Sequence, residues 1–520
     1  MMRIWHLRRV VFVLGTAAVL GSILIFLSGT KSGLPNMKLL ESSHIDRIQR
    51  LKQKMKLPMR KTTPLASNET CTALSGNLNS SLGPRIRPEK PLLQKLLAQS
   101  SLPSAPPWPS DVESLFDVEA IKSSGLPLFK PRIPALVYHK QTFLAFSEAR
   151  FDGLKDYGNI MMVVRRGLVQ GREISWGQIK LLVNLPTFRI NNPSPIVDRV
   201  NDAIVLVFAA FPTELSFQDM MAFPRFPMSK LFVMKTYDLG ETWTTHEDIS
   251  HQTVLKMFPV PVLMVPGPGH SIQLKCGRLV VPCNYFTQDK RGKSLHGLCQ
   301  NCSNYNRIIY SDDGGNTWTI GGRSKFKRDS FRIPIHPNEV MAVELDNGVV
   351  SLNSRTLNFQ QTRAVIYSFD GGATLSETQL KEELIEPGWK ITNQGKSSPR
   401  AAGGCQASVI AFPRPKGISI GQATWVLLSN PADRIERQNL ALRLSIDGCQ
   451  SWSKPFKIHD VFAAYSDIAY FEMVNANGTS LPHLALLFEG GMKGPYEYTR
   501  FKIFTLGQVL QGLITSSLNR

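Results

Sequence analysis

The chain has 520 residues, of which 42% are hydrophobic, and a formal net charge of +20. That length is sufficient for a large buried core. The basic charge is unevenly placed, because residues 1–110 contain 16 Lys and Arg against 4 Asp and Glu, or 16 − 4 = +12. This asymmetry argues against a nucleic-acid-binding folded domain. It fits either a solvated basic stalk or a tether near an anionic membrane surface.

The N-terminal region contains an uncharged run of 19 residues, 10–28, directly after a short basic segment. A bilayer requires about 20 apolar residues, whereas the apolar part of a cleaved signal peptide has about 7–15. We therefore expect a head at 1–9 and an uncleaved transmembrane signal-anchor at 10–28. The protein would be a single-pass membrane protein whose folded domain is lumenal or extracellular, in the Golgi, plasma membrane or lysosome. A cleaved signal peptide is the alternative.

Residues 29–112 are predicted to form a basic, proline-containing stalk ahead of the folded domain. Residues 44–57 have the pattern of a short basic amphipathic helix, and prolines between 103 and 109 favour a stiff, non-helical lead. N-x-S/T sequons, which are mildly consistent with a lumenal location, occur at Asn68, Asn79, Asn301 and Asn477.

Seven cysteines are too few for a disulfide scaffold of this length, and their number is odd. Cys276, Cys283, Cys299 and Cys302 lie close enough in sequence to form two bridges. A zinc site is the sharper alternative, although the spacing of Cys276 and Cys283 suits it poorly. We predict no metal and no cofactor.

The region from residue 130 to 505 consists of short apolar runs separated by turn residues, without long helical periodicity. This pattern is typical of an all-β fold. A turn motif, S/T-x-D-x-G-x-T/S-W, recurs with small variations around Asp238, Asp313, Asp370 and Asp447, at intervals of 75, 57 and 77 residues. Such intervals predict a six-bladed β-propeller over residues 113–510, with these four turns on its rim.

Several segments carry a specific family resemblance. They are Pro131-Arg-Ile-Pro134, Leu144-Ala-Phe-Ser-Glu-Ala-Arg150, Asn338-Glu339, Asn353-Ser-Arg355, Gly404-Cys-Gln406, Arg437, Tyr465-Ser-Asp467 and Leu487-Phe-Glu489. In this order they resemble the motifs of animal exo-α-sialidases (neuraminidases), with features of both the plasma-membrane and the lysosomal types. A second match, Phe331-Arg-Ile-Pro334, is interpreted as a decoy because it lies beyond two of the turn repeats.

The resemblance implies a role for each matching residue. It implies Tyr465 as nucleophile, Glu339 as its base, Asp156 as acid, and Arg132, Arg355 and Arg437 as a clamp on the substrate carboxylate, with Glu489 orienting one arginine. Arg150 would bind near the sugar's 4-substituent, while Gln406 and Glu214 would bind polar groups. Tyr285 would line the glycerol and aglycone side. Asp152 competes with Asp156, and Glu344 competes with Glu339.

The residue types suit the chemistry. Guanidinium forks match a carboxylate in shape and charge. A neutral tyrosine avoids the repulsion that a carboxylate nucleophile would meet at a carbon bearing a carboxylate, and sialidases depart from the two-carboxylate scheme in this way.

We therefore expect an exo-α-sialidase that releases terminal α-linked sialic acids from glycoproteins, oligosaccharides and gangliosides, with retention through a tyrosyl-enzyme intermediate. Its partners would be these sialylated glycoconjugates and the membrane, not nucleic acid, and its oligomeric state is open. The alternatives are a catalytically silent propeller that binds sialylated glycans and a type II membrane glycosyltransferase, against which the turn repeats speak.

Overall fold

The computed structural model describes residues 71, 82–100, 102, 108, 114–222, 228–288, 302–357, 360–391, 397–399, 403–474 and 478–516. Residues 69–520 form one compact unit. Within the described part, no helix has both the length and the apolar character of a membrane span. The predicted anchor at 10–28, the amphipathic segment 44–57 and all four sequons lie outside the described residues.

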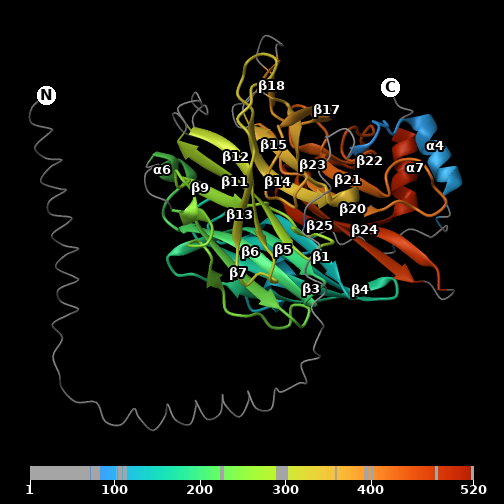
Figure 1. The fold of residues 1–520 in the computed structure, drawn as a ribbon. Helices are drawn as coiled ribbons and strands as arrows, with labels where there is room; N and C mark the ends of the chain where they lie inside the picture. Colours follow the sequence, from blue (N-terminus) through green and yellow to red (C-terminus); the bar gives the residue numbers. More distant parts are fainter. Residues whose placement is uncertain are drawn as a thin grey trace, which may run out of the picture. The chain divides into compact units, whose positions relative to one another are not determined.

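The fold is built mostly from antiparallel sheets, which follow one another along the chain (Figure 1). The first three sheets comprise β1 (Lys130–His139), β2 (Thr142–Arg150), β3 (Ile160–Gln170) and β4 (Glu173–Val183); β5 (Phe188–Asp198), β6 (Ala203–Pro212), β7 (Lys230–Thr236) and β8 (Glu247–Asp248); and β9 (Leu263–Pro266), β10 (Ile272–Gln273), β11 (Leu279–Gln288), β12 (Cys302–Ser311) and β13 (Thr319–Arg323).

The later sheets comprise β14 (His336–Glu344), β15 (Val350–Leu357), β16 (Thr362–Ser368) and β17 (Gln379–Ile385); the hairpin β18 (Trp389–Ile391) and β19 (Ser397–Pro399); and β20 (Ser408–Pro413), β21 (Thr424–Pro431), β22 (Gln438–Ser445), β23 (Phe456–Val474), β24 (Ser480–Gly491) and β25 (Tyr498–Thr505). Among the described residues the helices are α4 (Lys90–Gln99), α5 (Val118–Ser123), α6 (Phe217–Ala222) and α7 (Leu506–Ser516), with 3₁₀ turns at Val254–Lys256 and Asp346–Gly348.

The architecture is all-β and propeller-like, as predicted, but the number of blades differs from the prediction. Apart from the β18–β19 hairpin, the described residues form five sheets rather than six separate blades. The reason lies in β23, which has 19 residues and runs without a break. Its first part pairs with β22 and the rest pairs with β24, so one continuous strand joins six strands into a single sheet.

Strand alternation explains how neighbouring sheets share cores. Every residue of β6 from Ala203 to Phe211 is buried. Because successive side chains point to opposite faces, Val205 and Val207 belong to one hydrophobic cluster, while Leu206 and Phe208 belong to the next. Both faces of the strand are therefore covered, which is why β6 reads as a continuous apolar run.

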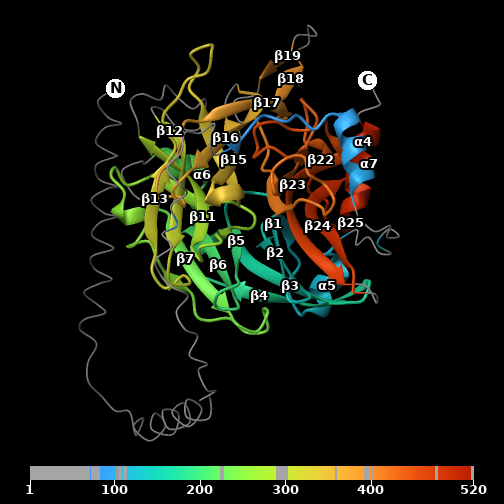
Figure 2. The same ribbon diagram turned by 45° about the vertical axis from the view of Figure 1, so that its right-hand side comes forward.

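The four repeated turns connect the third and fourth strands of their sheets, where β7 meets β8 and β12 meets β13, for example. In the first turn, Thr236 Oγ1 donates to the Asp238 carboxylate at 2.8 Å, and the Thr242 amide donates to the same oxygen at 2.9 Å. First strands of neighbouring sheets, such as β1 and β5, contact one another, and both views show these two strands near the middle of the ribbon (Figures 1 and 2). The turns after the third strands therefore lie toward the outside, as predicted.

Part of the predicted stalk is packed on the folded domain. α4 contacts α7, and the two helices lie side by side in both views (Figures 1 and 2). Leu93 and Leu96 of α4 are buried in the cluster that contains Leu510 and Leu513 of α7. The chain before α4 is attached as well, because the Ile86 amide donates to the Asp447 carboxylate at 2.9 Å. The predicted boundaries at 113 and 510 therefore cut through packed structure at both ends.

The cysteine predictions are corrected by a bridge of long range. Cys71 and Cys276 form a disulfide with an S–S distance of 2.09 Å, across 205 residues. Cys283 is a free thiol in the core. Cys276 and Cys283 therefore do not form two local bridges with Cys299 and Cys302, and the zinc alternative that required them is wrong.

Candidate active site

The candidate site is assembled where inner strands lose their regular pairing. The register shifts between Arg132 and Ala135 in β1, between Pro337 and Val340 in β14, and between Ala463 and Ser466 in β23. Such irregularities bend a strand and re-aim its side chains, and they are common beside active sites. Each of the three contains or adjoins a predicted site residue, namely Arg132, Glu339 and Tyr465.

Tyr465 and Glu339 are in direct contact. Tyr465 Oη donates a hydrogen bond to Glu339 Oε1. The other carboxylate oxygen, Oε2, accepts from Arg355 Nη1 at 2.8 Å, and the same nitrogen lies 3.4 Å from Tyr465 Oη. Three residues from three strands, β23, β14 and β15, thus form one hydrogen-bonded group that contains a hydroxyl, a proton acceptor and a cation.

Burial decides the protonation state of Tyr465, which is 6% exposed. Burial and the nearby Glu339 carboxylate raise the pKa of Tyr465 well above its usual value. Arg355 and Arg437 act in the opposite direction but do not offset this effect. The hydroxyl therefore holds its proton, and a base must remove it before the oxygen can act as a nucleophile.

Arg132 is fixed by Glu489. Its Nε donates to Glu489 Oε1 at 2.7 Å, and the Ile133 amide donates to the same oxygen at 2.8 Å. The second oxygen, Oε2, accepts from the Tyr465 amide at 3.2 Å. Glu489 is completely buried, so it orients the arginine and ties β1 to the strand that carries Tyr465.

Arg437 lies just before β22 and is held by neutral groups. Its Nη2 donates to the Gly404 carbonyl at 3.0 Å, and its Nη1 donates to Tyr496 Oη at 2.7 Å. Its guanidinium carbon is 5.5 Å from the centre of the Tyr465 ring. Gly404 has φ +84°, and a Cβ there would lie 2.9 Å from Arg355 Cγ, so glycine is required at this close approach.

The three predicted clamp arginines are therefore close together around one tyrosine. Arg132 and Arg437 each have the guanidinium carbon 5.5 Å from the Tyr465 ring centre, and Arg355 reaches the hydroxyl of the same ring. Three clustered guanidinium groups are the arrangement that binds a carboxylate, because several forks can share its two oxygens.

Asp156 lies on the loop after β2 and is paired with Arg150, whose Nη1 donates to its carboxylate at 2.6 Å. The Asp156 side chain is 77% exposed, whereas that of Arg150 is 3% exposed. Desolvation of the Asp156 carboxyl would raise its pKa, but the charges of Arg150, Arg132 and Arg437 and the hydrogen bond from Arg150 together outweigh this effect and lower the pKa. Asp152 is used differently, because its carboxylate accepts from the Asn159 amide at 2.7 Å within the same loop.

Arg150 is itself anchored by Glu148, which belongs to the same Leu144–Arg150 motif. Nη2 and Nε of Arg150 donate to Glu148 Oε2 at 2.7 and 2.9 Å. Glu148 Oε1 accepts from Asn191 Nδ2 and from the Asn192 amide, both at 3.0 Å. The buried carboxylate thus fixes the arginine, and the arginine in turn fixes the loop that carries Asp156.

The sequence predicts that Gln406 and Glu214 bind polar groups of the substrate. The structure places Gln406 in the interior and Glu214 on the surface. Gln406 is 1% exposed, and its amide bonds Ser466 twice, Nε2 to the carbonyl and Oε1 to the amide, at 3.0 Å each. It therefore braces the residue after Tyr465. Glu214 is exposed on the loop after β6, where the neighbouring Thr213 carbonyl accepts from the Gly158 amide at 3.0 Å.

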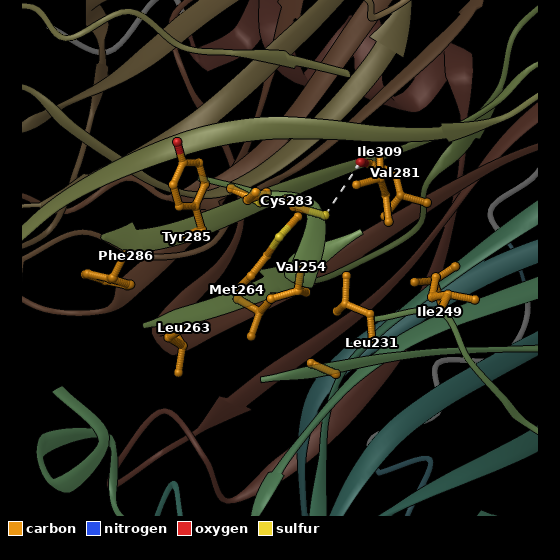
Figure 3. Packing of buried hydrophobic residues seen from close by; sticks show 14 of the residues in the cluster. Leu231, Ile249, Val254, Leu263, Met264, Val281, Cys283, Tyr285, Phe286 and Ile309 are labelled. Atoms are coloured by element: carbon orange, nitrogen blue, oxygen red, sulfur yellow. Dashed lines mark hydrogen bonds between the residues drawn. The ribbon is translucent and has the colours of Figure 1, made fainter. Parts of the chain in front are cut away.

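Tyr285 lies in the core rather than on an open surface. It is 2% exposed, and its ring stacks on Tyr305 with 5.7 Å between centroids. Figure 3 shows it in the cluster with Phe286, Met264 and Cys283. This placement argues against the predicted contact with the glycerol or aglycone part of a substrate.

The competing assignments are separated by position. Glu344, at the far end of β14 from Glu339, accepts from the Lys275 amide at 2.9 Å. The second Arg-Ile-Pro match lies on an exposed turn between β13 and β14, where Phe331 is 83% exposed. The structure thus brings Glu339 and Arg132, not Glu344 and Arg332, next to Tyr465.

A cavity of ≈340 Å³ adjoins the arginine group, on the side of Arg437. Its lining includes Glu436, Arg437, Phe462 and Tyr496. It provides space beside the clamp that is bounded by both charged and aromatic side chains.

Comparison with known proteins supports the resemblance. Residues 141–479 match the BNR repeat-like domain. The chain belongs to the BNR repeat-like family. Mouse Sialidase-3 is 29% identical over 418 residues, which cover 73% of this chain and 92% of that protein. Mouse Sialidase-2 is 27% identical and covers 72% and 92%. The resemblance to animal sialidases that the motifs predicted is thereby confirmed.

A solved structure shows a similar fold. The Hadza microbial sialidase Hz136 superposes with a TM-score of 0.54 at 21% identity. The match covers 73% of this chain and 66% of that one, so this chain spans about two thirds of its length. At this identity the likeness establishes the fold alone.

Two site features were missed by the sequence reasoning. Glu148 carried a signal, because it stands inside the Leu144–Arg150 motif two residues before an arginine on the same face of the strand. Tyr496 carried none, since its contact with Arg437 depends on a turn between β24 and β25 that only the folded chain reveals.

Proposed function

We propose that this protein is an exo-α-sialidase, a glycoside hydrolase that removes terminal α-linked sialic acid. The observation that supports this most strongly is the contact of Tyr465 with Glu339, surrounded by Arg132, Arg355 and Arg437. The relatives named sialidases support the same chemistry. Terminal sialic acids of glycoproteins, oligosaccharides and gangliosides are the proposed substrates.

In the proposed first step the arginines hold the substrate carboxylate, which lies on the anomeric carbon. Tyr465 Oη attacks that carbon while Glu339 accepts the phenolic proton. The bond to the leaving oxygen breaks, and Asp156 supplies the proton which that oxygen requires. The sugar is then joined covalently to Tyr465.

In the second step Asp156, now ionised, removes a proton from water, and the water oxygen attacks the anomeric carbon. The bond to Tyr465 breaks, and Glu339 returns the proton to the phenol. Two displacements restore the original configuration, so the proposal is a retaining mechanism.

The first test is release of a fluorescent alcohol from its α-sialoside by the purified protein, measured from acidic to neutral pH. Turnover that is abolished by Arg437→Ala supports the proposal. A folded protein that binds sialylated glycans but releases no alcohol at any pH would instead establish the alternative, a silent binding propeller.

We further propose that residues 10–28 anchor the enzyme in a membrane, with the catalytic domain lumenal or extracellular. The uncharged length of this run supports the proposal. The protein should remain in the membrane fraction after alkaline carbonate washing, and deletion of residues 1–30 should release it. A native chain that begins after residue 30 would show instead that the segment is cleaved.

A further inference from the structure

Arg437 is held unlike the other two clamp arginines, each of which pairs with a carboxylate. Within the described part of the chain, Arg437 takes part in no ion pair. Its side chain instead donates to two neutral oxygens, the carbonyl of Gly404 and the hydroxyl of Tyr496. Its position is therefore fixed without a direct bond to a carboxylate among the described residues.

Tyr496 also contacts a second clamp arginine. The guanidinium carbon of Arg132 lies 4.0 Å from the centre of the Tyr496 ring, which is the geometry of a cation–π contact. The face of one ring thus supports Arg132, while the hydroxyl of the same ring accepts from Arg437 at 2.7 Å. One neutral side chain fixes the spacing of two like charges that would otherwise repel each other.

Tyr496 is presented by an ordered turn. The carboxylate of Glu497 accepts from the amides of Met492 and Lys493, both at 2.9 Å, and the Glu497 amide donates to the Gly490 carbonyl at 3.0 Å. These bonds close the connection between β24 and β25. β24 also carries Glu489, the partner of Arg132. The same strand therefore positions both the turn and one arginine of the clamp.

The chemistry explains why a neutral partner suits this position. A carboxylate bonded to Arg437 would compete with the substrate's carboxylate for the same donors, whereas a phenol positions the guanidinium and adds no negative charge beside it. We propose that Tyr496 is a positioning residue for carboxylate recognition, which spaces Arg437 and Arg132 for one bound carboxylate. This inference rests on the proposed sialidase function.

The test uses the full chain and three variants. Tyr496→Phe removes only the hydroxyl, Tyr496→Leu removes the ring face as well, and Tyr498→Phe is the control. The control hydroxyl lies 3.3 Å from His459 Nε2 and not on a clamp arginine. For each protein, kcat and KM are measured on an aryl α-sialoside, together with competitive inhibition by N-acetylneuraminic acid and by its methyl ester.

We expect Tyr496→Phe to raise KM and to weaken inhibition by the acid by roughly tenfold, the size of one hydrogen bond to a charged group. Inhibition by the ester should change little, because the ester carries no charge for Arg437 to bind. Tyr496→Leu should have the larger effect, and Tyr498→Phe should match the wild type.

Two results would overturn the inference. In the first, the wild type turns over the sialoside and Tyr496→Phe equals it in both KM and inhibition by the acid. In the second, acid and ester weaken in proportion, which is the effect of a merely structural residue. A folded wild type without turnover would instead remove the proposed function and this inference with it. If Tyr496→Leu does not fold, Tyr496→Phe alone decides.

Discussion

Tyr465 is a weak nucleophile by itself, because its raised pKa keeps the buried hydroxyl protonated throughout the physiological range. Its reactivity must come from Glu339, which already accepts its hydrogen bond in the free protein. Arg355 contacts both partners, so negative charge that develops on the phenol oxygen meets a cation at once. The proton acceptor and the stabilising charge are thus in place before substrate arrives.

The replacement Tyr465→Phe removes the attacking oxygen and keeps the ring. We expect turnover of an aryl sialoside to fall by about 10³-fold or more, because the covalent step is lost while binding by the arginines remains. Tyr470→Phe is a matched control on the same strand, since its hydroxyl donates to the surface residue Glu472. Equal activity of Tyr465→Phe and wild type would remove Tyr465 from the mechanism.

Asp156 is expected to act as an acid, yet Arg150 lowers its pKa and favours the ionised form. The fraction of Asp156 that holds a proton grows as pH falls, so activity on natural glycosides should be highest at acidic pH. Asp156→Asn should impair sialyllactose hydrolysis at least about 100-fold more than hydrolysis of a nitrophenyl sialoside, because a phenol leaves without protonation. The ratio of kcat/KM for the two substrates measures this; an unchanged ratio would exclude Asp156 as the acid.

His336, the first residue of β14, makes the stability of the fold depend on pH. It is 1% exposed, and its Nδ1 accepts from the Asn304 amide at 3.3 Å, which requires a neutral ring. Burial, aided by the charge of Arg328, lowers its pKa to about 4. An unfolded histidine has a pKa of about 6.5, so the unfolded chain binds the proton first. The stability that the neutral His336 contributes is therefore complete above about pH 6.5 and is lost as pH falls toward 4.

From this shift the free energy of unfolding should fall by about 2 kcal/mol between pH 7 and pH 5 through His336 alone. Urea unfolding at the two pH values measures the difference. In His336→Gln, which keeps a hydrogen-bonding group without titrating, the fall should be smaller by that amount. The same fall in both proteins would show that other groups cause it.

At the scale of elements, the segment ahead of the propeller is part of the fold. α4 begins with Pro91 in its first turn and buries Leu93 and Leu96 against α7. An isolated ten-residue helix is marginal in water, so this contact is what holds α4. The Cys71–Cys276 disulfide restrains the same part of the chain at a second point.

Replacement of Leu96 by Ala should therefore lower the free energy of unfolding of the whole domain by about 2–5 kcal/mol, because Leu96 is completely buried. Lys95→Ala on the exposed side of the same helix is the matched control and should change it by less than about 0.5 kcal/mol. Denaturant unfolding of both variants distinguishes a packed helix from a free stalk, in which neither change would matter.

The sequence could predict local turns, but it could not predict contacts between distant segments of the chain. The turn around Asp238 was predictable because the Asp238 carboxylate bonds to Thr236 and Thr242, all within seven residues. The place of Tyr285 was not, because a shift of one residue along a strand exchanges the site face for the core face. The packing of α4 on α7 joins segments about 400 residues apart, and no local pattern encodes such a contact.

At the scale of the molecule, the chain's last sheet closes against its first, since β1 contacts both β23 and β24 (Figures 1 and 2). Asp467 marks the meeting point. Its carboxylate accepts from the amides of Leu136 and His270 at 2.8 Å and from Ser408 Oγ at 2.7 Å, so three separate segments converge there. Tyr465 stands two residues away and is positioned by this closure rather than by its own strand alone.

The same continuity explains why five sheets are found where six blades were predicted. The turn repeats predicted separate blades, but β23 passes from one group of strands to the next while it stays paired. The register shift between Ala463 and Ser466 marks the passage, and Tyr465 lies within it.

The most direct test of the mechanism is proton NMR of the first sugar released from 3′-sialyllactose by the full chain, recorded before the anomers equilibrate. Attack by Tyr465 followed by attack by water inverts the anomeric carbon twice. Free sialic acid should therefore appear first as the α anomer and change to the β anomer afterwards. Initial appearance of the β anomer would contradict a covalent intermediate on Tyr465, and the absence of any free sialic acid would contradict the sialidase function itself.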